Sequence, residues 1–151
     1  MHRLYEQEDI AVFWDSVKCR HAKRCVGASP VTFNRERRPW IDVTKAPAKE
    51  IWQAVSACPS GALTCVYTHG IRVTLDESGL KSVAYDGDKV IGECDYHITP
   101  DGWVIYHTEV LPEYGGKSIA KRLVYKVIEK AERSGAEVSA TCSYAVKVLA
   151  E

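Results

Sequence analysis

Apolar residues in the second half of the chain gather in three runs, over 80–85, 89–98 and 103–111, with polar turns between them. The turns read Asp86-Gly87-Asp88 and Pro100-Asp101-Gly102. Short turns of this composition join neighbouring antiparallel strands. The pattern therefore predicts an antiparallel meander of three strands.

The period of the apolar residues changes after the meander. They then occur at helical spacing, at Ile119, Ala120, Leu123, Val124, Val127, Ile128 and Ala131. Neighbours three or four residues apart share one face of a helix, and Gly135 is a natural residue to end it. The sequence predicts a long helix here, then a last strand over 138–142 and the start of another helix over 145–150.

The first half of the chain has shorter elements. We expect a strand over 8–14, a loop or helical turn over 19–25 and a short strand over 40–43. Pro47 suits the first turn of a helix that ends at Cys58. The apolar face of this helix is made of Ile51, Trp52 and Val55.

The change of pattern between the two halves predicts two small modules. Residues 71–75 form a strand or a linker, and we place the boundary near Gly70, between a module of 1–69 and one of 70–151. The predicted fold class is α+β. A core of this size is small for an independent domain, so we expect each module to need a further source of stability.

Composition excludes several classes of function. The 151 residues are 46% hydrophobic and 26% charged, and 20 basic side chains balance 20 acidic ones, so nothing demands a nucleic acid or an anionic membrane as partner. No apolar run approaches the ~20 residues of a membrane span, and the N-terminus lacks the apolar core of a signal peptide. We expect a cytoplasmic protein whose six cysteines are ligands, nucleophiles or buried thiols rather than disulfides.

Three cysteines of the first module have the spacing of an iron–sulfur site. Cys19 and Cys25 are six residues apart, and the distant Cys58 is followed directly by Pro59. A close pair of thiols and a distant Cys-Pro are typical of chains that bind a small iron–sulfur cluster. The proline also prevents the preceding helix from continuing.

Three thiolates suit a [3Fe–4S] cluster, or a [4Fe–4S] cluster with one iron open or bound by another ligand. His21 is the nearest candidate for that ligand, and Cys65 is a second one. The loop is rich in basic side chains, at Lys18, Arg20, Lys23 and Arg24. Such charges stabilise the net negative charge of a thiolate-bound cluster.

Two other interpretations of these residues stay open. Cys19, His21, Cys25 and Cys58 could together bind a zinc ion as a Cys₃His set, although the two-residue gap between Cys19 and His21 is short for two ligands of one tetrahedral ion. The thiols could instead be buried as small hydrophobic side chains, with His21 an ordinary surface residue.

Residues 5–65 resemble a divergent single-cluster ferredoxin-like domain. The resemblance rests on Lys18-Cys19-Arg20-His21-Ala22, on Arg38-Pro39-Trp40-Ile41 and on Cys58-Pro59-Ser60-Gly61-Ala62-Leu63. It implies an iron–sulfur cluster held by Cys19, Cys25 and Cys58. A standard ferredoxin would have a fourth cysteine where this chain has Ala22.

The turn Gly115-Gly116-Lys117-Ser118 precedes the long helix. A glycine-rich turn before a helix presents backbone N–H groups and a positive dipole end, which favours a phosphate or pyrophosphate group. Turns before helices also use glycine for geometry alone. The turn by itself does not decide between these interpretations.

Residues 78–151 resemble a minimal GNAT-type N-acetyltransferase domain. The matching segments are 107–110, 112–124 and 141–144. The resemblance implies that the strand ending at Val110 and Leu111 pairs with the pantetheine arm of acetyl-CoA. It also implies that backbone N–H groups bind the pyrophosphate, at Gly115, Gly116, Lys117, Ser118, Ile119 and Ala120. Two departures from the family pattern are Ser118, in place of glycine or alanine, and Glu113, in place of glutamine or arginine.

The same resemblance implies direct attack of an amine on the thioester, with a base, an oxyanion donor and an acid. Glu109 or His107 is the candidate base, the backbone N–H near Val110 the oxyanion donor, and Cys142 or Tyr144 the acid. Cys142 could alternatively accept the acyl group itself. Each of these side chains could also have only a structural role.

The sequence thus predicts a ferredoxin-like cluster module followed by a GNAT-like antiparallel sheet with one long helix. Its first functional hypothesis is an acetyl-CoA-dependent N-acetyltransferase that acts on a small-molecule or protein amine. Its second is an electron-transfer or cluster-carrying protein with a redox partner, and its third is a zinc-stabilised binding module. The chain ends seven residues after Tyr144, where the family continues, so we expect an incomplete substrate side or one completed by a partner subunit.

Overall fold

The computed structural model describes residues 2–20 and 22–150 and forms two compact units, Met1–His69 and Gly70–Glu151. Each unit combines an antiparallel or mixed sheet with helices, as expected for the α+β class. None of the described helices has both the length and the apolar character needed to cross a membrane. The units are treated separately below.

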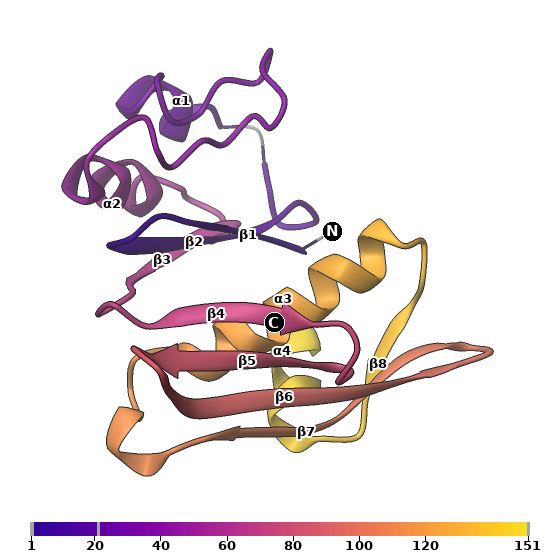
Figure 1. Cartoon of the computed structure of the whole chain (residues 1–151). Helices are drawn as coiled ribbons and strands as arrows, with labels where there is room; N and C mark the ends of the chain where they lie inside the picture. The colour runs from indigo at the N-terminus through magenta and orange to yellow at the C-terminus, as the bar shows by residue number, and fades with distance from the viewer. Residues whose placement is uncertain (1, 21, 151) are drawn as a thin grey trace. The chain divides into compact units, whose positions relative to one another are not determined.

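The first unit contains a three-stranded antiparallel sheet in the order β1-β2-β3. The strands are β1 (His2–Glu6), β2 (Ile10–Asp15) and β3 (Leu63–Tyr67). Two helices, α1 (Arg24–Ala28) and α2 (Ala48–Ser56), lie on one side of this sheet (Figure 1). The strand predicted over 8–14 is therefore confirmed as β2, whereas β1 was not predicted.

Helix α2 forms where the sequence predicted a helix, with Pro47 as its N-cap residue. The ring of Pro47 fixes its φ near the helical value, so this residue suits the entry to a helix. Ile51, Ala54 and Val55 are buried and pack with apolar residues of the sheet. The core of the unit contains Ile10, Val12, Phe33, Ile41, Val43 and Leu63 besides these three.

The strand predicted over 40–43 is wrong. The structure has only one isolated bridge there, between Phe33 and Ile41, and it closes a loop in which the Asn34 N–H donates to the Trp40 carbonyl at 2.8 Å. Asp42 ends the pairing, because its carboxylate accepts the N–H of Thr44 at 3.0 Å. An aspartate that accepts such a local hydrogen bond turns the chain out of an extended course.

The second unit contains a five-stranded sheet in the order β4-β5-β6-β7-β8. Its strands are β4 (Arg72–Asp76), β5 (Lys81–Asp86), β6 (Lys89–Thr99), β7 (Gly102–Val110) and β8 (Val138–Ala140). The first four are antiparallel, and β8 is parallel to β7. The predicted meander is therefore confirmed as β5, β6 and β7.

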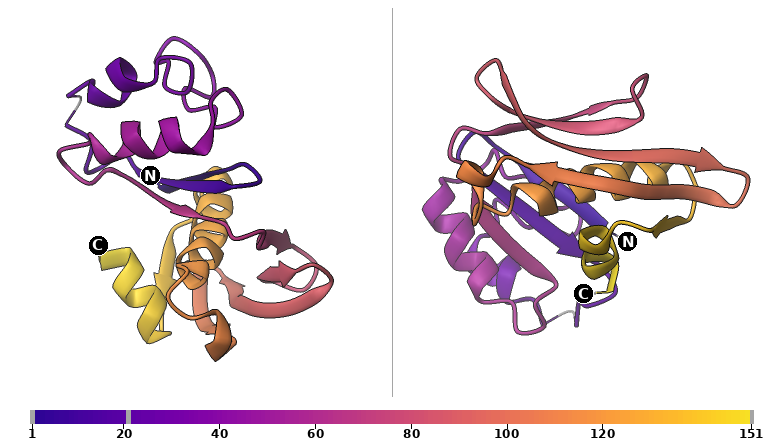
Figure 2. Two further views of the ribbon diagram at one scale, coloured as in Figure 1. Left: turned by 90° about the vertical axis from the view of Figure 1, so that its left-hand side faces the viewer. Right: turned by 90° about the horizontal axis from the view of Figure 1, so that it is seen from below.

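Helices follow β7 and β8. A short 3₁₀ helix, η1 (Pro112–Tyr114), leads into α3 (Ile119–Arg133), and α4 (Ser143–Ala150) follows β8. Helix α3 runs along one face of the sheet (Figure 2) and contacts β4 to β7. Its predicted apolar face is buried, and Gly135 follows its end with a φ of 77°, which an L side chain adopts only under strain.

Strand β7 is irregular at the place where it leaves its neighbour β8. Asp95 pairs with His107 and Tyr96 with Ile105, so Tyr106 is an extra residue that forms a β-bulge. The pairing with β8 covers only Trp103 to Ile105. Beyond it the N–H groups of residues 141 and 142 both donate to the Ile105 carbonyl, at 2.9 and 3.4 Å. The last residues of β7 therefore have an edge that β8 does not cover.

Candidate functional site

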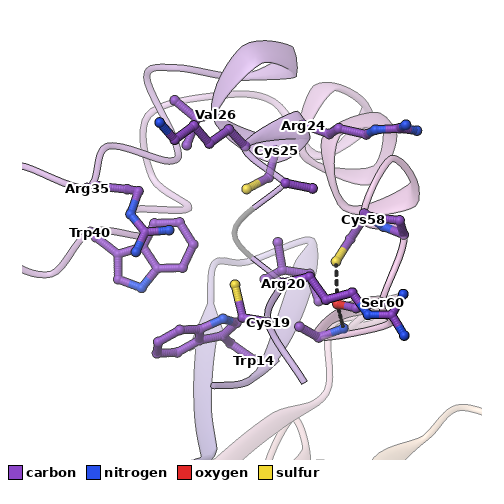
Figure 3. Close-up of a pocket in the computed structure, with 15 residues that line it drawn as sticks. Trp14, Cys19, Arg20, Arg24, Cys25, Val26, Arg35, Trp40, Cys58 and Ser60 are labelled. Atoms are coloured by element: carbon purple, nitrogen blue, oxygen red, sulfur yellow. Dashed lines mark hydrogen bonds between the residues drawn. The ribbon is translucent and has the colours of Figure 1, made fainter. Parts of the chain in front are cut away.

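Three cysteines from separate segments line one cavity of the first unit. Cys19 follows β2, Cys25 lies in α1, and Cys58 lies just past the end of α2. Figure 3 shows their sulfur atoms directed into a common space. Counted up to its opening to solvent, this space is about 420 Å³. The structure therefore brings together the three predicted thiol ligands, while His21 lies outside the described residues.

Local backbone geometry holds each thiol in place. The Cys19 N–H donates to the Ser16 carbonyl at 3.3 Å in a turn after β2. The Cys58 N–H donates to the Val55 carbonyl at 3.0 Å in the last turn of α2, and the following proline prevents another turn. Cys65 lies on β3, packs against the core and does not line the cavity.

The protein environment lowers the pKa of the Cys58 thiol and so makes its thiolate easier to form than that of an ordinary cysteine. Burial raises the pKa of this thiol, but hydrogen bonds from the Ser60 hydroxyl and from nearby backbone N–H groups outweigh burial and lower the pKa overall. The Cys58 sulfur lies 3.6 Å from the Ser60 oxygen. Hydrogen bonds of this kind to a ligand sulfur also stabilise a bound cluster in its reduced, more negative state.

The pKa of Cys25 is raised, first by burial and then by the negative charges of the Cys58 and Cys19 thiolates. Three thiolates in one space repel each other unless positive charge lies between them. Basic side chains at the rim of the cavity supply part of that charge, from Arg20, Lys23, Arg24 and Arg35. Iron ions between the sulfurs would supply the rest.

Trp14 carries a hydrogen-bond donor that the protein itself does not satisfy. Its indole nitrogen Nε1 is buried and has no acceptor among the described residues. Trp14 lies beside Cys19 in the cavity wall (Figure 3) and packs edge-on against Trp40, with ring centroids 5.2 Å apart. A buried N–H without an acceptor is costly. A sulfur-rich group in the cavity would supply the acceptor, so the cavity fits such a group.

Within residues 2–20 and 22–150, no three histidine, cysteine or acidic side chains lie close enough together to hold a single metal ion. In an iron–sulfur cluster each thiolate binds a different iron, so the ligand sulfurs lie further apart than the ligands of one ion.

A second candidate site lies in the second unit, at the glycine turn before α3. The space around the turn is about 580 Å³ up to its opening to solvent. It is lined by Val110, Tyr114, Gly115, Gly116, Lys117, Ser118, Ile119, Ala120 and Tyr144. Seven of the eight residues predicted to bind the cofactor, and Tyr144, are therefore in one place; Leu111 lines a different pocket.

The turn has the backbone geometry of an anion cradle. Gly116 has a φ of 78°, and a Cβ atom at this residue would meet nothing within 4 Å. Ser118, the N-cap of α3, has a φ of 56° and its side chain caps none of the helix N–H groups. The first N–H groups of a helix have no carbonyl partner within the helix. They therefore face the pocket together with the positive end of the helix dipole.

Glu113, which replaces the usual glutamine or arginine, does not line this pocket. Its carboxylate pairs with Lys89 at 3.6 Å. The neighbouring Tyr114 hydroxyl donates to Asp86 at 2.5 Å. The acid is thereby held by a lysine of β6 instead of facing the anion cradle.

The uncovered edge of β7 presents the N–H of Val110. The Leu111 N–H donates to the Ile91 carbonyl at 2.8 Å, and Val110 stands opposite Gly92. This pattern makes Val110 and Gly92 a non-hydrogen-bonded pair, so the Val110 N–H points away from β6. It points toward the edge that β8 leaves open, where an oxyanion donor was predicted.

The candidate base lies on the other face of the sheet. His107 and Glu109 are exposed, and their Nε2 and Oε2 atoms are 3.4 Å apart. Glu109 stands opposite Glu93, and His107 opposite Asp95. Alternation along the strand puts these side chains on the face opposite Thr108 and Val110. His107 and Glu109 are two residues apart on the strand predicted over 103–111, so their shared face follows from the strand period, whereas the acids opposite them on β6 were not predicted.

Cys142 belongs to a chain of three polar groups. Its thiol donates to the Thr108 hydroxyl at 3.5 Å, and that hydroxyl donates to the Cys94 sulfur at 3.6 Å. Burial raises the pKa of Cys142, but its hydrogen bond with the Thr108 side chain and hydrogen bonds from backbone N–H groups lower the pKa overall. Burial raises the pKa of Cys94 to about 12. We therefore expect the two thiols to differ in reactivity.

We expect iodoacetamide to modify Cys142 well before Cys94 in the folded protein, because the thiolate is the reactive form. A lowered pKa means that thiolate appears at a lower pH. Thr108→Val removes the strongest hydrogen bond to the Cys142 sulfur, so the pH at which alkylation becomes rapid should rise for this thiol. Peptide mass spectrometry over a pH series measures both effects. Equal rates at Cys142 and Cys94 would contradict the structure.

Comparisons with known proteins find matches for both halves of the chain. Residues 5–68 match a family described as a divergent 4Fe-4S mono-cluster, and residues 82–151 match the GCN5-related N-acetyltransferase family. The uncharacterized protein YjdI of Escherichia coli K12 is 34% identical over 62 residues, which is 41% of this chain and 82% of YjdI. The same figures hold for YjdI of Escherichia coli O157:H7.

Among solved structures, a GCN5-related N-acetyltransferase from Sphaerobacter thermophilus is similar with a TM-score of 0.40 and 14% identity. The match covers 90% of this chain and 36% of that one. The two family models together define the class of protein as an iron–sulfur domain followed by an acetyltransferase-like domain. In particular, the chain is related to YjdI, and its residues 5–68 and 82–151 match the models of the divergent 4Fe-4S mono-cluster family and of the GCN5-related N-acetyltransferases, respectively.

Proposed function

We propose that this protein binds one iron–sulfur cluster through Cys19, Cys25 and Cys58 and is an acetyl-CoA-dependent N-acetyltransferase. The observation that carries the first part is the convergence of three thiols on one cavity with a basic rim. The second part is supported by the glycine cradle beside an uncovered strand edge. The six free thiols suit a reducing compartment such as the cytoplasm.

The three thiols suit a [3Fe–4S] cluster or a [4Fe–4S] cluster. In the second case the fourth iron is open or takes a ligand such as His21. The basic residues of the rim and the hydrogen bonds to Cys58 act in the same direction, since both stabilise negative charge in the cavity. They raise the reduction potential of the bound group.

We expect Trp14→Phe to lower the reduction potential of the bound cluster, because it removes a buried N–H in the cavity wall that has no acceptor among the described residues. Phenylalanine keeps an aromatic ring that can pack against Trp40 but has no N–H group. Trp52→Phe is the control, since Trp52 stacks on Tyr67 and does not line the cavity. Potentiometric titration followed in the visible spectrum measures the potential. An unchanged potential in Trp14→Phe would mean that the indole does not contact the cluster.

In the second unit the backbone N–H groups of the turn and of the first turn of α3 would bind the pyrophosphate of acetyl-CoA. Lys117 adds positive charge to the same pocket. The uncovered edge of β7 would pair with the pantetheine arm, and the Val110 N–H would donate to the thioester oxygen. Bound acetyl-CoA supplies a thioester whose acyl carbon is attacked by an amine.

The protein's own groups would move the protons of this reaction. Glu109, with His107, would take a proton from the amine as its nitrogen bonds to the acyl carbon, through water where needed. Tyr144 or Cys142 would give a proton to the sulfur that leaves. Glu93 and Asp95 share the face of Glu109, and burial and the Glu93 charge raise the pKa of Asp95. This negative surface favours a protonated amine as acceptor.

A second candidate function is electron transfer or cluster delivery, with the C-terminal unit as an interaction module. The basic rim of the cavity favours it, because Arg20, Lys23 and Arg24 are exposed and suit an acidic redox partner. The two functions differ in their dependence on acetyl-CoA.

Purification without oxygen, with iron, sulfide and zinc counted per chain, tests the cluster. A brown protein with about three to four iron and sulfide per chain supports it, and a colourless protein with one zinc per chain supports a zinc module instead.

An activity assay tests the transferase. The protein is incubated with acetyl-CoA and a mixture of amines, and the free CoA that is released is measured. Reversible bleaching by dithionite without any acetyl transfer would favour the second function.

A further inference from the structure

The first unit has a second cavity, next to the one that the cysteines line. We call it the arginine pocket, and it is lined by Arg3, Arg35 and Arg38 together with Tyr5, Trp14 and Trp40. The space in it is about 850 Å³ up to the opening to solvent. No cysteine lines it. The arginine pocket therefore lacks the thiol ligands that a cluster needs and is distinct from the cysteine cavity.

The sheet forms one wall of the arginine pocket. Arg3 stands opposite Trp14, and Tyr5 opposite Val12, on the antiparallel pair β1–β2. Residues at alternate positions share a face of a sheet, so Arg3, Tyr5 and Trp14 are on one face. A cation and two aromatic rings are thus held on a rigid surface.

The loop between Phe33 and Ile41 forms the other wall. Arg37 holds this loop, since its guanidinium donates to the carbonyls of Val31, Thr32, Pro39 and Trp40 at 2.7–3.3 Å. Arg35 lies over the Trp40 ring at 5.8 Å. Arg38 donates through one nitrogen to the carbonyls of Arg35 and Arg37, at 2.8 and 3.0 Å.

The loop leaves two guanidinium groups without acidic partners. Across the described part of the chain, neither Arg35 nor Arg38 pairs with a carboxylate. Both side chains are exposed at the pocket. A third guanidinium, that of Arg3, lines the same space, so the pocket concentrates positive charge at a concave surface.

We propose that the arginine pocket binds a small planar aromatic anion, a ring system that carries a phosphate or a carboxylate. Guanidinium groups bind phosphate and carboxylate through paired hydrogen bonds. The rings of Tyr5, Trp14 and Trp40 provide surfaces for an aromatic body. The concave shape and the three rings favour a small molecule over the side chain of an acidic protein.

The bound ring would share a wall with the cysteine cavity. Trp14, Arg35 and Trp40 line both spaces. The ligand is therefore placed next to the cluster site, and the aromatic pair Trp14–Trp40 contributes to both walls. The side chains that would bind this ligand are the same whichever metal group occupies the cysteine cavity.

Calorimetry on the full-length protein, purified without oxygen, tests this proposal with four probes. They are 1-naphthyl phosphate, 1-naphthoate, 1-naphthol and inorganic phosphate. We expect one or both aromatic anions to bind, more weakly as salt is added, and which of them binds more tightly identifies the anionic group. Naphthol and inorganic phosphate should each bind at least about tenfold more weakly, because each lacks one half of the contacts.

Two variants assign the binding to the pocket. Arg35→Gln/Arg38→Gln should weaken binding at least about tenfold, since each removes a charge-assisted hydrogen bond. Glu36→Gln is the matched control, because Glu36 lies in the same loop and does not line the pocket. It should bind as the parent protein does, and circular dichroism shows whether each variant keeps its fold.

Four results would overturn the proposal. These are no binding of either aromatic anion, equal binding of naphthol, equal binding of inorganic phosphate, and undiminished binding by the double arginine variant.

Discussion

Cys25→Ala should yield a colourless protein with almost no iron or sulfide. Cys25 is one of only three thiols that line the cavity, and it lies in α1, which has five residues and no side-chain cap of its own. Two remaining thiolates cannot hold a cluster of three or four irons firmly. Visible absorption and metal analysis after purification without oxygen measure the loss.

The same substitution should lower the stability of the first unit. Binding free energy at a metal site is also folding free energy when the site does not exist in the unfolded chain. A unit of this size buries too little apolar surface to be strongly stable by itself. We expect the melting transition of this unit to fall by several degrees or to disappear, as measured by circular dichroism.

Cys65→Ala is the matched control for Cys25→Ala. Burial raises the pKa of Cys65 to about 11, and the residue packs on β3 against the core outside the cavity. This variant should keep its colour and its iron. If Cys25→Ala kept full iron, or if Cys65→Ala lost it, the assignment of ligands would be wrong.

Gly116→Glu should abolish the binding of acetyl-CoA. The residue has a φ of 78°, so a side chain is strained there, and the new carboxylate would face the groups that bind pyrophosphate. Ligand at about 100 times its dissociation constant stabilises a protein by about 2.7 kcal/mol. For a unit of this size we expect acetyl-CoA to raise the melting temperature of the parent protein by on the order of 10 °C, and that of the variant not at all.

Gly135→Glu controls for the backbone strain. Gly135 has a φ of 77° and equally open surroundings, but it follows the far end of α3 and lines no part of the pocket. Both variants should lose similar stability, while only Gly135→Glu should still be stabilised by acetyl-CoA. If acetyl-CoA raised the melting temperature of both variants equally, the glycine turn would not be part of the binding site. No response in the parent protein would count against acetyl-CoA binding altogether.

The elements that the sequence predicted well are those with a strong local pattern. The meander β5–β7 has turns that allow few other conformations, and α3 has apolar residues at a steady helical spacing. The strand expected over 40–43 did not form, because Asp42 binds the backbone two residues on and Trp40 packs against Trp14 instead of extending a sheet. Local propensity there is weaker than the tertiary contacts.

By itself, the sequence predicted the chemistry that we propose for the two candidate sites. The spacing of Cys19, Cys25 and Cys58-Pro59 and the glycine turn before α3 are short segments whose function depends on their own backbone, so they can be recognised before any fold is known. The shared face of His107 and Glu109 follows from the period of a strand in the same way.

The tertiary structure alone decided which distant groups meet. The bulge at Tyr106 sets the phase of β7, so that Thr108 contacts Cys94 and Cys142 while Glu109 joins the acids of β6 on the other face. The indole N–H of Trp14 and the three guanidinium groups of the arginine pocket come together only when β1, β2 and a later loop are assembled. Contacts between residues far apart in the chain depend on register and packing, which no local pattern encodes.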